Sequence, residues 1–372
     1  MTEDRLEQQA KKKKNKKVKD FMILVGYTVI LILIMYVGAG LFTWLNGEIE
    51  QNQLETEQVI SQLQAEDYVE ANGGAVTGTD TGASGDGNGV ASVDRAQEIL
   101  DSLKESLTSG ATTIEAIRPF YEDELIIASG GKFHFVPINE ELKMNDYVQE
   151  NLQILENGEY QYVENGEVIS HKGIDVSKFQ GDIDWEKVAA DDVEFAFIRA
   201  ALRGYGTGKL VEDGYFEENI EEASRAGVKV GAYVYTQAIT EEEILEEAQL
   251  ILDMVAPYSL DCPIVIDVEK VSGDDGRMNA LSVEERTNLV LLFCQTIEDA
   301  GYKPMIYHNM EMGALMLDIE TFENYDKWFA SYSDTFYYPY QYEIWQYSDN
   351  GTVDGIDGPV DLNISFSKFW EE

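Results

Sequence analysis

Two carboxylates follow a short apolar segment of the chain, and their type and spacing could support acid–base chemistry. Asp267 and Glu269 come directly after residues 263–266, whose sequence PIVI is typical of a buried strand. Residues two apart on a strand point to the same side, so both carboxylates are expected to face one way. Charged groups beside a buried strand are costly unless they are used, which favours a functional role.

Two further carboxylates are expected at the same place. Asp175 ends the strand-like segment GIDVS, and Asp361 lies at the start of the segment VDLN. Hydrolysis of a glycosidic bond needs one carboxyl group that stays protonated and donates to the leaving oxygen. It also needs one that stays ionised and stabilises positive charge at the anomeric carbon. Like charges packed together raise the pKa of one member, which supplies the acid.

Acidic pairs also arise by chance in this chain, which has 70 Asp and Glu among 372 residues. A second Asp-Val-Glu tripeptide, Asp192 to Glu194, precedes a predicted strand instead of following one. In β/α barrels chemistry lies at the C-terminal ends of the strands, and the opposite end is structural. We therefore predict a functional role for Asp267 and Glu269 and a structural role for the other tripeptide.

Short apolar strands recur from Gly173 onwards, with helical stretches between the first five. Two of these helices, 215–226 and 282–300, are followed by Gly227 and Gly301, as expected where a helix ends in a left-handed residue. The predicted strands are GIDVS, FAFIRA, VKVGAYVY, CPIVIDVE, KPMIYHN, KWFASY, YEIWQYS and VDLNIS. Alternation of buried strands with helices predicts an α/β fold with a parallel sheet, and eight strands predict its closure into a barrel.

Residues 173–372 resemble glycoside hydrolase family 25, the Chalaropsis-type lysozymes or N-acetylmuramidases. The resemblance is carried, in order, by GIDVS, FQG, IDW, FAFIRA, AGVKVGAY, PIVIDVE, MIYHN, WFASY, WQYS and VDLN. It implies an irregular eight-stranded TIM-like β/α barrel that cleaves the β-1,4 bond between N-acetylmuramic acid and N-acetylglucosamine in peptidoglycan. It also implies that Glu269 is the general acid and that Asp267 orients or stabilises the substrate N-acetyl group or the oxocarbenium centre. Asp175 and Asp361 would be supporting carboxylates.

Aromatic residues on the predicted strands could stack on sugar faces or belong to the core. We predict substrate contacts for Tyr233, Tyr235, Tyr307 and Trp345, and Trp328 has the same two interpretations. Val234 stands where the family often carries His, a departure that concerns a minor contact. The glycine-rich segment 204–209 resembles a phosphate-binding loop, but Leu210 stands where such a loop needs Ser or Thr. A flexible loop on the glycan side of the barrel is therefore favoured.

Composition argues against several other classes. The formal net charge of −43 leaves too little basic surface to bind nucleic acid. His134, His171 and His308 are scattered and form no HExxH motif, so we expect no catalytic zinc, and nothing indicates another cofactor. Cys262 begins a predicted strand and Cys294 lies in a predicted helix, which favours two buried thiols over a disulfide.

The N-terminal part predicts a membrane anchor. Residues 1–20 form a basic tail. Residues 21–45 form an apolar stretch without a charged side chain, and this stretch is long enough to cross a bilayer. The lysines of the tail place it in the cytoplasm and the rest of the chain outside. Residues 46–95 are expected to be a stalk and a Gly-rich flexible linker, with a spacer at 72–88.

Residues 96–170 predict a small α+β extension before the barrel at 171–372. A helix is expected at 96–107, and two hairpins are expected around Gly130-Gly131 and Asn165-Gly166. This extension contains no recognisable chemistry, and its partner, if it has one, is unknown.

Together these features predict a membrane-anchored, extracytoplasmic peptidoglycan hydrolase whose partners are glycan strands and the lipid bilayer. One alternative is a non-catalytic scaffold or sensor that binds wall glycan on the same barrel, although such a module has no need for the acid. Another is a glycosidase that acts on a different N-acetylated polymer.

Overall fold

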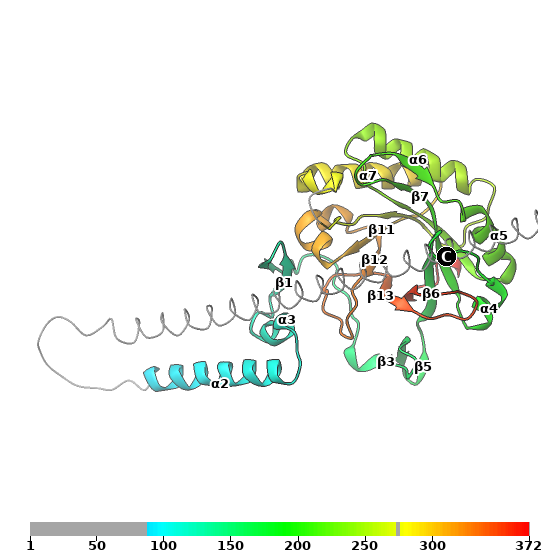
Figure 1. Ribbon diagram of the computed structural model, residues 1–372. Helices are drawn as coiled ribbons and strands as arrows, with labels where there is room; N and C mark the ends of the chain where they lie inside the picture. The colour runs from blue at the N-terminus through cyan, green and yellow to red at the C-terminus, as the bar shows by residue number, and fades with distance from the viewer. Residues whose placement is uncertain (1–87, 273–275, 372) are drawn as a thin grey trace, which may run out of the picture. The chain divides into compact units, whose positions relative to one another are not determined.

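The computed structural model describes residues 88–272 and 276–371 (Figure 1). The predicted basic tail 1–20, the predicted membrane span 21–45 and the linker up to residue 87 lie outside these residues. Among the helices that are described, none is both long and apolar enough to cross a membrane. Residues 90–372 form one compact unit.

Eight strands close into a barrel in the order β6-β14-β13-β12-β11-β10-β9-β7, and β7 pairs with β6 to complete the circle. All eight predicted strands are present. Their bounds are β6 (His171–Val176), β7 (Phe195–Arg203), β9 (Lys229–Tyr235), β10 (Ile264–Asp267), β11 (Pro304–Asn309), β12 (Asp326–Ala330), β13 (Ile344–Gly351) and β14 (Val360–Ser365). A short strand, β8 (Leu210–Glu212), pairs antiparallel with the end of β7.

The last strand is inverted. β14 runs antiparallel to both of its neighbours, β13 and β6, whereas the other pairs around the barrel are parallel. The prediction of a parallel sheet is therefore wrong for β14. No helix lies between β13 and β14, and an antiparallel pair needs only a short connection, whereas a parallel pair needs a long crossover.

Helices cover the outside of the barrel (Figure 1). The longer ones are α4 (Trp185–Ala190), α5 (Phe216–Ala226), α6 (Glu241–Val255) and α7 (Val283–Asp299). As predicted, α5 ends at Gly227, whose φ of 92° is left-handed. The α7 helix begins with a capping box in which Ser282 and Glu285 each accept a hydrogen bond from the other's backbone N–H. Single turns complete this part, namely η3 (Arg277–Ala280), the π-helical η4 (Met312–Met316), η5 (Ile319–Phe322) and η6 (Phe369–Glu371).

Alternation along the strands divides the apolar side chains into two cores. Residues such as Ile174 and Ile266 point outward against the helices, and residues such as Phe197 and Trp328 fill the barrel. Gly173 faces the interior, where a Cβ atom would lie 2.2 Å from the ring of Phe195. Only glycine fits there, because the ring of Phe195 already occupies the space that a side chain would need. Aromatic rings such as those of Phe195, Phe197 and Trp328 form the packed floor beneath the predicted site.

The extension consists of the helices α2 (Asn88–Thr108), α3 (Thr113–Ile117), η1 (Arg118–Phe120) and η2 (Gln149–Asn151) and the strands β1 (Glu124–Ser129), β2 (Lys132–Pro137), β3 (Leu152–Ile154), β4 (Tyr160–Glu164) and β5 (Glu167–Val168). Both predicted hairpins are present. Gly130 and Gly131, and likewise Asn165 and Gly166, have the positive φ angles of a tight turn. Helix α2 begins at Asn88, so the prediction of a linker is wrong for residues 88–95, which are helical.

The extension packs on the segment that follows β12. Tyr337 accepts a hydrogen bond from the Ile126 backbone N–H at 2.7 Å, and its ring lies 4.5 Å from the Arg118 guanidinium. A second anchor lies nearer the predicted site, where Ser129, Lys270 and Glu311 contact one another through their side chains. Lys270 directly follows Glu269, so the extension contacts the segment that carries the predicted acid.

Candidate active site

The barrel topology brings the four predicted carboxylates to one end. Asp175 and Asp267 lie at the C-terminal ends of β6 and β10, and Glu269 follows two residues later. Asp361 lies near the N-terminal end of β14, but the inversion of that strand puts its beginning at the same end of the barrel. Asp361 is paired with Asp175 across β14 and β6. We call this group of four the mouth carboxylates.

Asp175 is held by two amide groups. Its Oδ2 atom accepts hydrogen bonds from Gln346 Nε2 at 2.8 Å and from Asn363 Nδ2 at 2.9 Å. The orientation of Asn363 is fixed, because its Oδ1 atom accepts from the Trp328 indole N–H, which can only donate, at 2.7 Å. Burial raises the pKa of Asp175 to about 6, and the two hydrogen bonds oppose that rise. Asp175 is therefore kept as an acceptor near neutral pH.

Asp267 is buried with one carboxylate oxygen unpaired within the part of the chain that the structure describes. Its Oδ1 atom has no hydrogen-bond partner among the described residues. Burial raises the pKa of Asp267 well above its usual value, and the nearby charges of Glu269 and Asp175 raise it further. A substrate N–H group or a developing positive charge would supply the interaction that this carboxylate lacks.

The pKa values of Glu269 and Asp361 are both raised. Burial raises the pKa of Glu269, while the Tyr307 hydroxyl, 3.4 Å from its Oε1 atom, opposes the rise. Burial and the charge of Asp175 raise the pKa of Asp361 to about 8. The mouth carboxylates therefore hold protons to higher pH than isolated carboxyl groups do, which favours general-acid catalysis.

A buried arginine partly offsets this negative charge. Arg199, on β7, lowers the pKa of both Asp175 and Asp267. It forms an ion pair with Asp213 at 2.8 Å and lies 5.2 Å from the ring centre of Phe179. The sequence did not identify Arg199 as a site residue. Its apolar neighbours in the segment FAFIRA do not indicate whether the Arg199 side chain points into the barrel or outward.

Three of the predicted aromatic residues lie at the mouth. The pKa of the Tyr233 hydroxyl is raised by burial and by Asp175, and that of Tyr235 by burial and by Asp267 and Glu269, so both lie near these carboxylates. Tyr307 contacts Glu269, as described above. Trp328, in contrast, is 1% exposed and stacks on Phe197 in the barrel floor. Its second interpretation, as core, is the one the structure supports.

The prediction for Trp345 is wrong. This residue points outward from β13, is 1% exposed, and packs against Tyr160 and Phe336 with ring centres 5.5 and 5.1 Å away. A fully buried ring outside the barrel offers no face to a sugar. Val234 also points outward into the layer between strands and helices, so its departure from the family pattern lies away from the mouth.

Residues that sequence reasoning missed complete the mouth. Gln346, the residue after Trp345, contacts Asp175 and also accepts hydrogen bonds from Tyr307 and Tyr332. Three aromatic side chains are more than half exposed in the segments that follow β6, β7 and β12, namely Phe179, Tyr205 and Tyr332. Tyr205 belongs to the predicted loop at 204–209, whose ends are joined by a 2.9 Å hydrogen bond from Gly204 N–H to Lys209 O.

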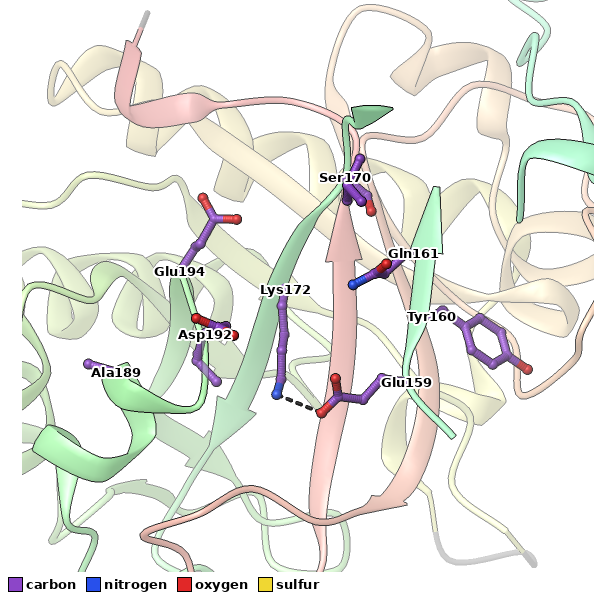
Figure 2. A pocket seen from close by; sticks show the side chains of 10 residues that line it. Glu159, Tyr160, Gln161, Ser170, Lys172, Ala189, Asp192 and Glu194 are labelled. Atoms are coloured by element: carbon purple, nitrogen blue, oxygen red, sulfur yellow. Dashed lines mark hydrogen bonds and ion pairs between the residues drawn. The ribbon is translucent and has the colours of Figure 1, made fainter. Parts of the chain in front are cut away.

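The second Asp-Val-Glu tripeptide lies at the opposite end of the barrel, before β7. Asp192 and Glu194 line a cavity of about 480 Å³ between the extension and the barrel. Figure 2 shows both residues with Lys172 and Glu159, which form an ion pair of 2.6 Å in this cavity. The Glu194 carboxylate contacts His171 at 2.9 Å and is 46% exposed. Its surroundings thus differ from those of Glu269, although the two tripeptides have the same composition.

The described residues also bear on the predictions for metal binding and for the two cysteines. Within residues 88–272 and 276–371, no three His, Cys, Asp or Glu side chains are grouped so as to hold a metal ion. Cys262 and Cys294 are both buried free thiols, which confirms the interpretation favoured from the sequence.

Comparison with known proteins places this barrel among relatives. Residues 174–356 match the family model of glycosyl hydrolases family 25. The chain is 33% identical over 209 residues to the uncharacterized protein YegX of Escherichia coli K12, which covers 52% of this chain and 68% of YegX. It is 28% identical over 198 residues to the autolytic lysozyme of Clostridium acetobutylicum, covering 52% of this chain and 55% of that protein. A family 25 glycosyl hydrolase structure from Bacillus anthracis is 26% identical, covers 56% of this chain and 93% of its own, and superposes with a TM-score of 0.46.

Proposed function

Because the chain belongs to glycosyl hydrolases family 25, we propose that this lysozyme-type glycoside hydrolase cleaves the β-1,4 bond between N-acetylmuramic acid and N-acetylglucosamine in peptidoglycan. The observation that carries the proposal is the set of mouth carboxylates, which topology gathers at one end of the barrel. Burial raises the pKa values of Glu269 and Asp361, so these groups hold protons to higher pH than isolated carboxyl groups do, which favours general-acid catalysis. The autolytic lysozyme of Clostridium acetobutylicum, named for this activity, supports the choice of substrate.

Glu269 is assigned the role of general acid. It gives its proton to the glycosidic oxygen as the bond to the anomeric carbon breaks. Asp267 is assigned the role of the partner that is ionised once substrate is bound. Burial, with no partner for its Oδ1 atom among the described residues, raises the pKa of Asp267, and the substrate N-acetyl group or the positive charge that develops would supply that partner. Asp175, which two amides hold as an acceptor, and Asp361 support this charge distribution. The exposed rings of Phe179, Tyr205 and Tyr332 lie where sugar faces could stack.

The alternative of a non-catalytic scaffold is disfavoured by the same observation. Burying several carboxylates together lowers the stability of the folded protein, since each raised pKa is a free-energy cost at neutral pH. A module that only binds glycan gains nothing from that cost. Stacking aromatic rings and neutral hydrogen-bonding groups would be sufficient for it.

Mass spectrometry of digested peptidoglycan tests the proposal. A muramidase leaves N-acetylmuramic acid at the new reducing end, whereas cleavage of the other glycosidic bond leaves N-acetylglucosamine there. Glycan that is bound but not cut would favour the scaffold. Cleavage only of a different N-acetylated polymer would favour the other alternative.

We propose further that the enzyme is a single-pass membrane protein with its barrel outside the cytoplasm. Residues 21–45 carry no charge over 25 positions, and eight basic side chains lie within the first twenty residues. These two features support insertion with the N-terminus in the cytoplasm. The Gly-rich segment 72–88 would tether the barrel near the membrane.

A further inference from the structure

Gln346 lies at the mouth, where it contacts Asp175 directly and is linked to Glu269 through the Tyr307 hydroxyl. The side chain is 3% exposed and points inward from β13. Its Nε2 atom donates to Asp175 Oδ2 at 2.8 Å. Its Oε1 atom accepts from the hydroxyl groups of Tyr307 at 2.8 Å and Tyr332 at 3.1 Å. A carbonyl oxygen has two lone pairs, so the two hydroxyl groups satisfy the amide oxygen of Gln346.

Tyr307 has two acceptors for one hydrogen. Its hydroxyl oxygen lies 2.8 Å from Gln346 Oε1 and 3.4 Å from Glu269 Oε1. A phenol carries a single O–H, so it can donate fully to only one of them at a time. Burial raises the pKa of Tyr307 well above its usual value, so the hydroxyl keeps this hydrogen. The short contact is the one to Gln346, and the long contact is the one to the acid.

We propose that Gln346 is a positioning residue that shares the Tyr307 hydroxyl hydrogen with Glu269. While Glu269 is protonated, Tyr307 donates to Gln346. When Glu269 gives its proton to the leaving sugar oxygen, Tyr307 turns its hydrogen to the new carboxylate, and Tyr332 continues to satisfy Gln346. No proton leaves Tyr307 in this exchange. The inference rests on the proposed role of Glu269 as the acid.

The exchange adjusts how readily Glu269 loses its proton. A hydrogen bond to the charged form of a carboxyl group lowers its pKa, so a competing acceptor for that donor raises it. The other ionisable groups that face Glu269 come from its own segment and from four further elements. They are Asp267 on its own segment, Asp175 on β6, Asp361 on β14, Tyr235 on β9 and Tyr332 after β12. Gln346 therefore acts against a background of acidic neighbours that all favour the protonated form.

Two substitutions should move the alkaline limb of the pH profile in opposite directions. In Tyr307→Phe the Glu269 carboxylate loses its donor, so the limb of kcat/KM on a soluble glycan fragment should move to higher pH. In Gln346→Met the Tyr307 hydroxyl is left with Glu269 as its acceptor, so the limb should move to lower pH. Each shift should be roughly half to one pH unit, the size expected from one hydrogen bond. In the double variant the effect of Gln346→Met on this limb should largely disappear.

Matched controls and a second variant keep the test decisive. Tyr325→Phe removes a Tyr–Glu hydrogen bond of 3.1 Å, and Gln249→Met removes a Gln–Asp hydrogen bond of 2.8 Å, both away from the mouth. Neither should move either limb. If Gln346→Met does not fold, Tyr332→Phe still tests the idea. It leaves Tyr307 as the donor to Gln346, so the alkaline limb should move slightly to higher pH.

Shifts in the same direction for Tyr307→Phe and Gln346→Met would overturn the proposal, as would a full Gln346→Met effect in the Tyr307→Phe background. Carboxyl ¹³C NMR titration measures the pKa of Glu269 directly in the full-length protein without substrate. This pKa should be highest in Tyr307→Phe, intermediate in the parent and lowest in Gln346→Met. A parent that cuts no glycan at any pH would count against the proposed function. The NMR titration would still decide whether Gln346 and Glu269 share the Tyr307 hydrogen.

Discussion

Asp361 lies directly opposite Asp175 across the antiparallel pair of β14 and β6. The two residues come from the beginning of one strand and the end of another, and only an inverted last strand brings these positions together. In a uniformly parallel barrel, Asp361 would lie at the opposite end, near Glu194. The inversion of β14 thus completes the mouth carboxylates, and beside the larger effect of burial it places the charge of Asp175 where it raises the pKa of Asp361.

The two Asp-Val-Glu tripeptides allow the same substitution to be compared at the two ends of the barrel. Glu269→Gln keeps the shape of the side chain but removes the donated proton, so turnover should fall by about 10²–10⁴ while the protein stays folded. Glu194→Gln makes the same chemical change at the other end of the barrel and should leave turnover nearly unchanged. Reducing-end assays on purified peptidoglycan measure both. An active Glu269→Gln enzyme, or equal damage from Glu194→Gln, would refute the assignment.

Asp267→Asn should abolish most activity and yet stabilise the protein. The folded-state pKa of Asp267 is raised above its ordinary value of 3.8, so the folded protein binds the proton more tightly than the unfolded chain does. Its contribution to stability is therefore fully present below about pH 4 and is lost as the pH rises through the folded pKa. An amide stays neutral at every pH and escapes this loss.

Thermal unfolding between pH 4 and 8 measures this effect. The Tm of Asp267→Asn should exceed that of the parent by a margin that is small near pH 4 and grows towards pH 8. Each kcal/mol recovered should add about 2–4 °C for a domain of this size. A Tm difference that does not change with pH would show that Asp267 is not destabilised by burial of its charge.

Sequence reasoning located the strands and the mouth carboxylates because both depend on local patterns. The apolar runs mark the strands, and the spacing of Asp267 and Glu269 fixes the side of β10 that faces the mouth. No such pair fixes the side on β13, where a shift of one residue exchanges the inner and outer faces. The choice of Trp345 instead of its neighbour Gln346 is an error of this kind. The inversion of β14 and the covering of Trp345 by the extension depend on contacts between distant segments, which no local pattern encodes.

Substitution of Trp345 should therefore affect mainly stability, whereas substitution of Tyr332 should affect mainly KM. Trp345→Ala removes a buried ring that packs on Tyr160 and Phe336, and it should lower the free energy of unfolding by about 3–5 kcal/mol. The KM of the protein that remains folded should change little. Tyr332→Ala removes an exposed ring at the mouth and should raise KM about threefold to tenfold with little effect on stability. Denaturant unfolding and steady-state kinetics on soluble glycan distinguish the two. A large KM effect of Trp345→Ala in a stable protein would restore the original prediction.

The proposed orientation in the membrane can be tested with protease. Added to cells whose wall has been removed, protease should degrade the barrel at residues 171–372 and leave a short fragment that contains residues 21–45. The basic tail should be protected, because the lysines hold it in the cytoplasm. Replacing Lys11 to Lys14 and Lys16, Lys17 and Lys19 with glutamine should weaken this preference and yield a protected fraction. Complete protection of the barrel in the parent would reverse the orientation.

The spacer at 72–88 should limit which part of the wall the enzyme can reach. Its residues before α2, 72–87, have a Gly, Ser and Thr content that predicts a coil with a root-mean-square span of only about 20–25 Å. A barrel on such a tether reaches wall close to the membrane. Deleting residues 74–84 should thus reduce cleavage of intact wall in cells, while cleavage of soluble fragments by the purified protein stays the same. A variant with the same residues in scrambled order keeps length and composition and should behave like the parent. Equal loss on both substrates would instead assign the segment a role in folding, because a tether affects only the substrate that it must reach.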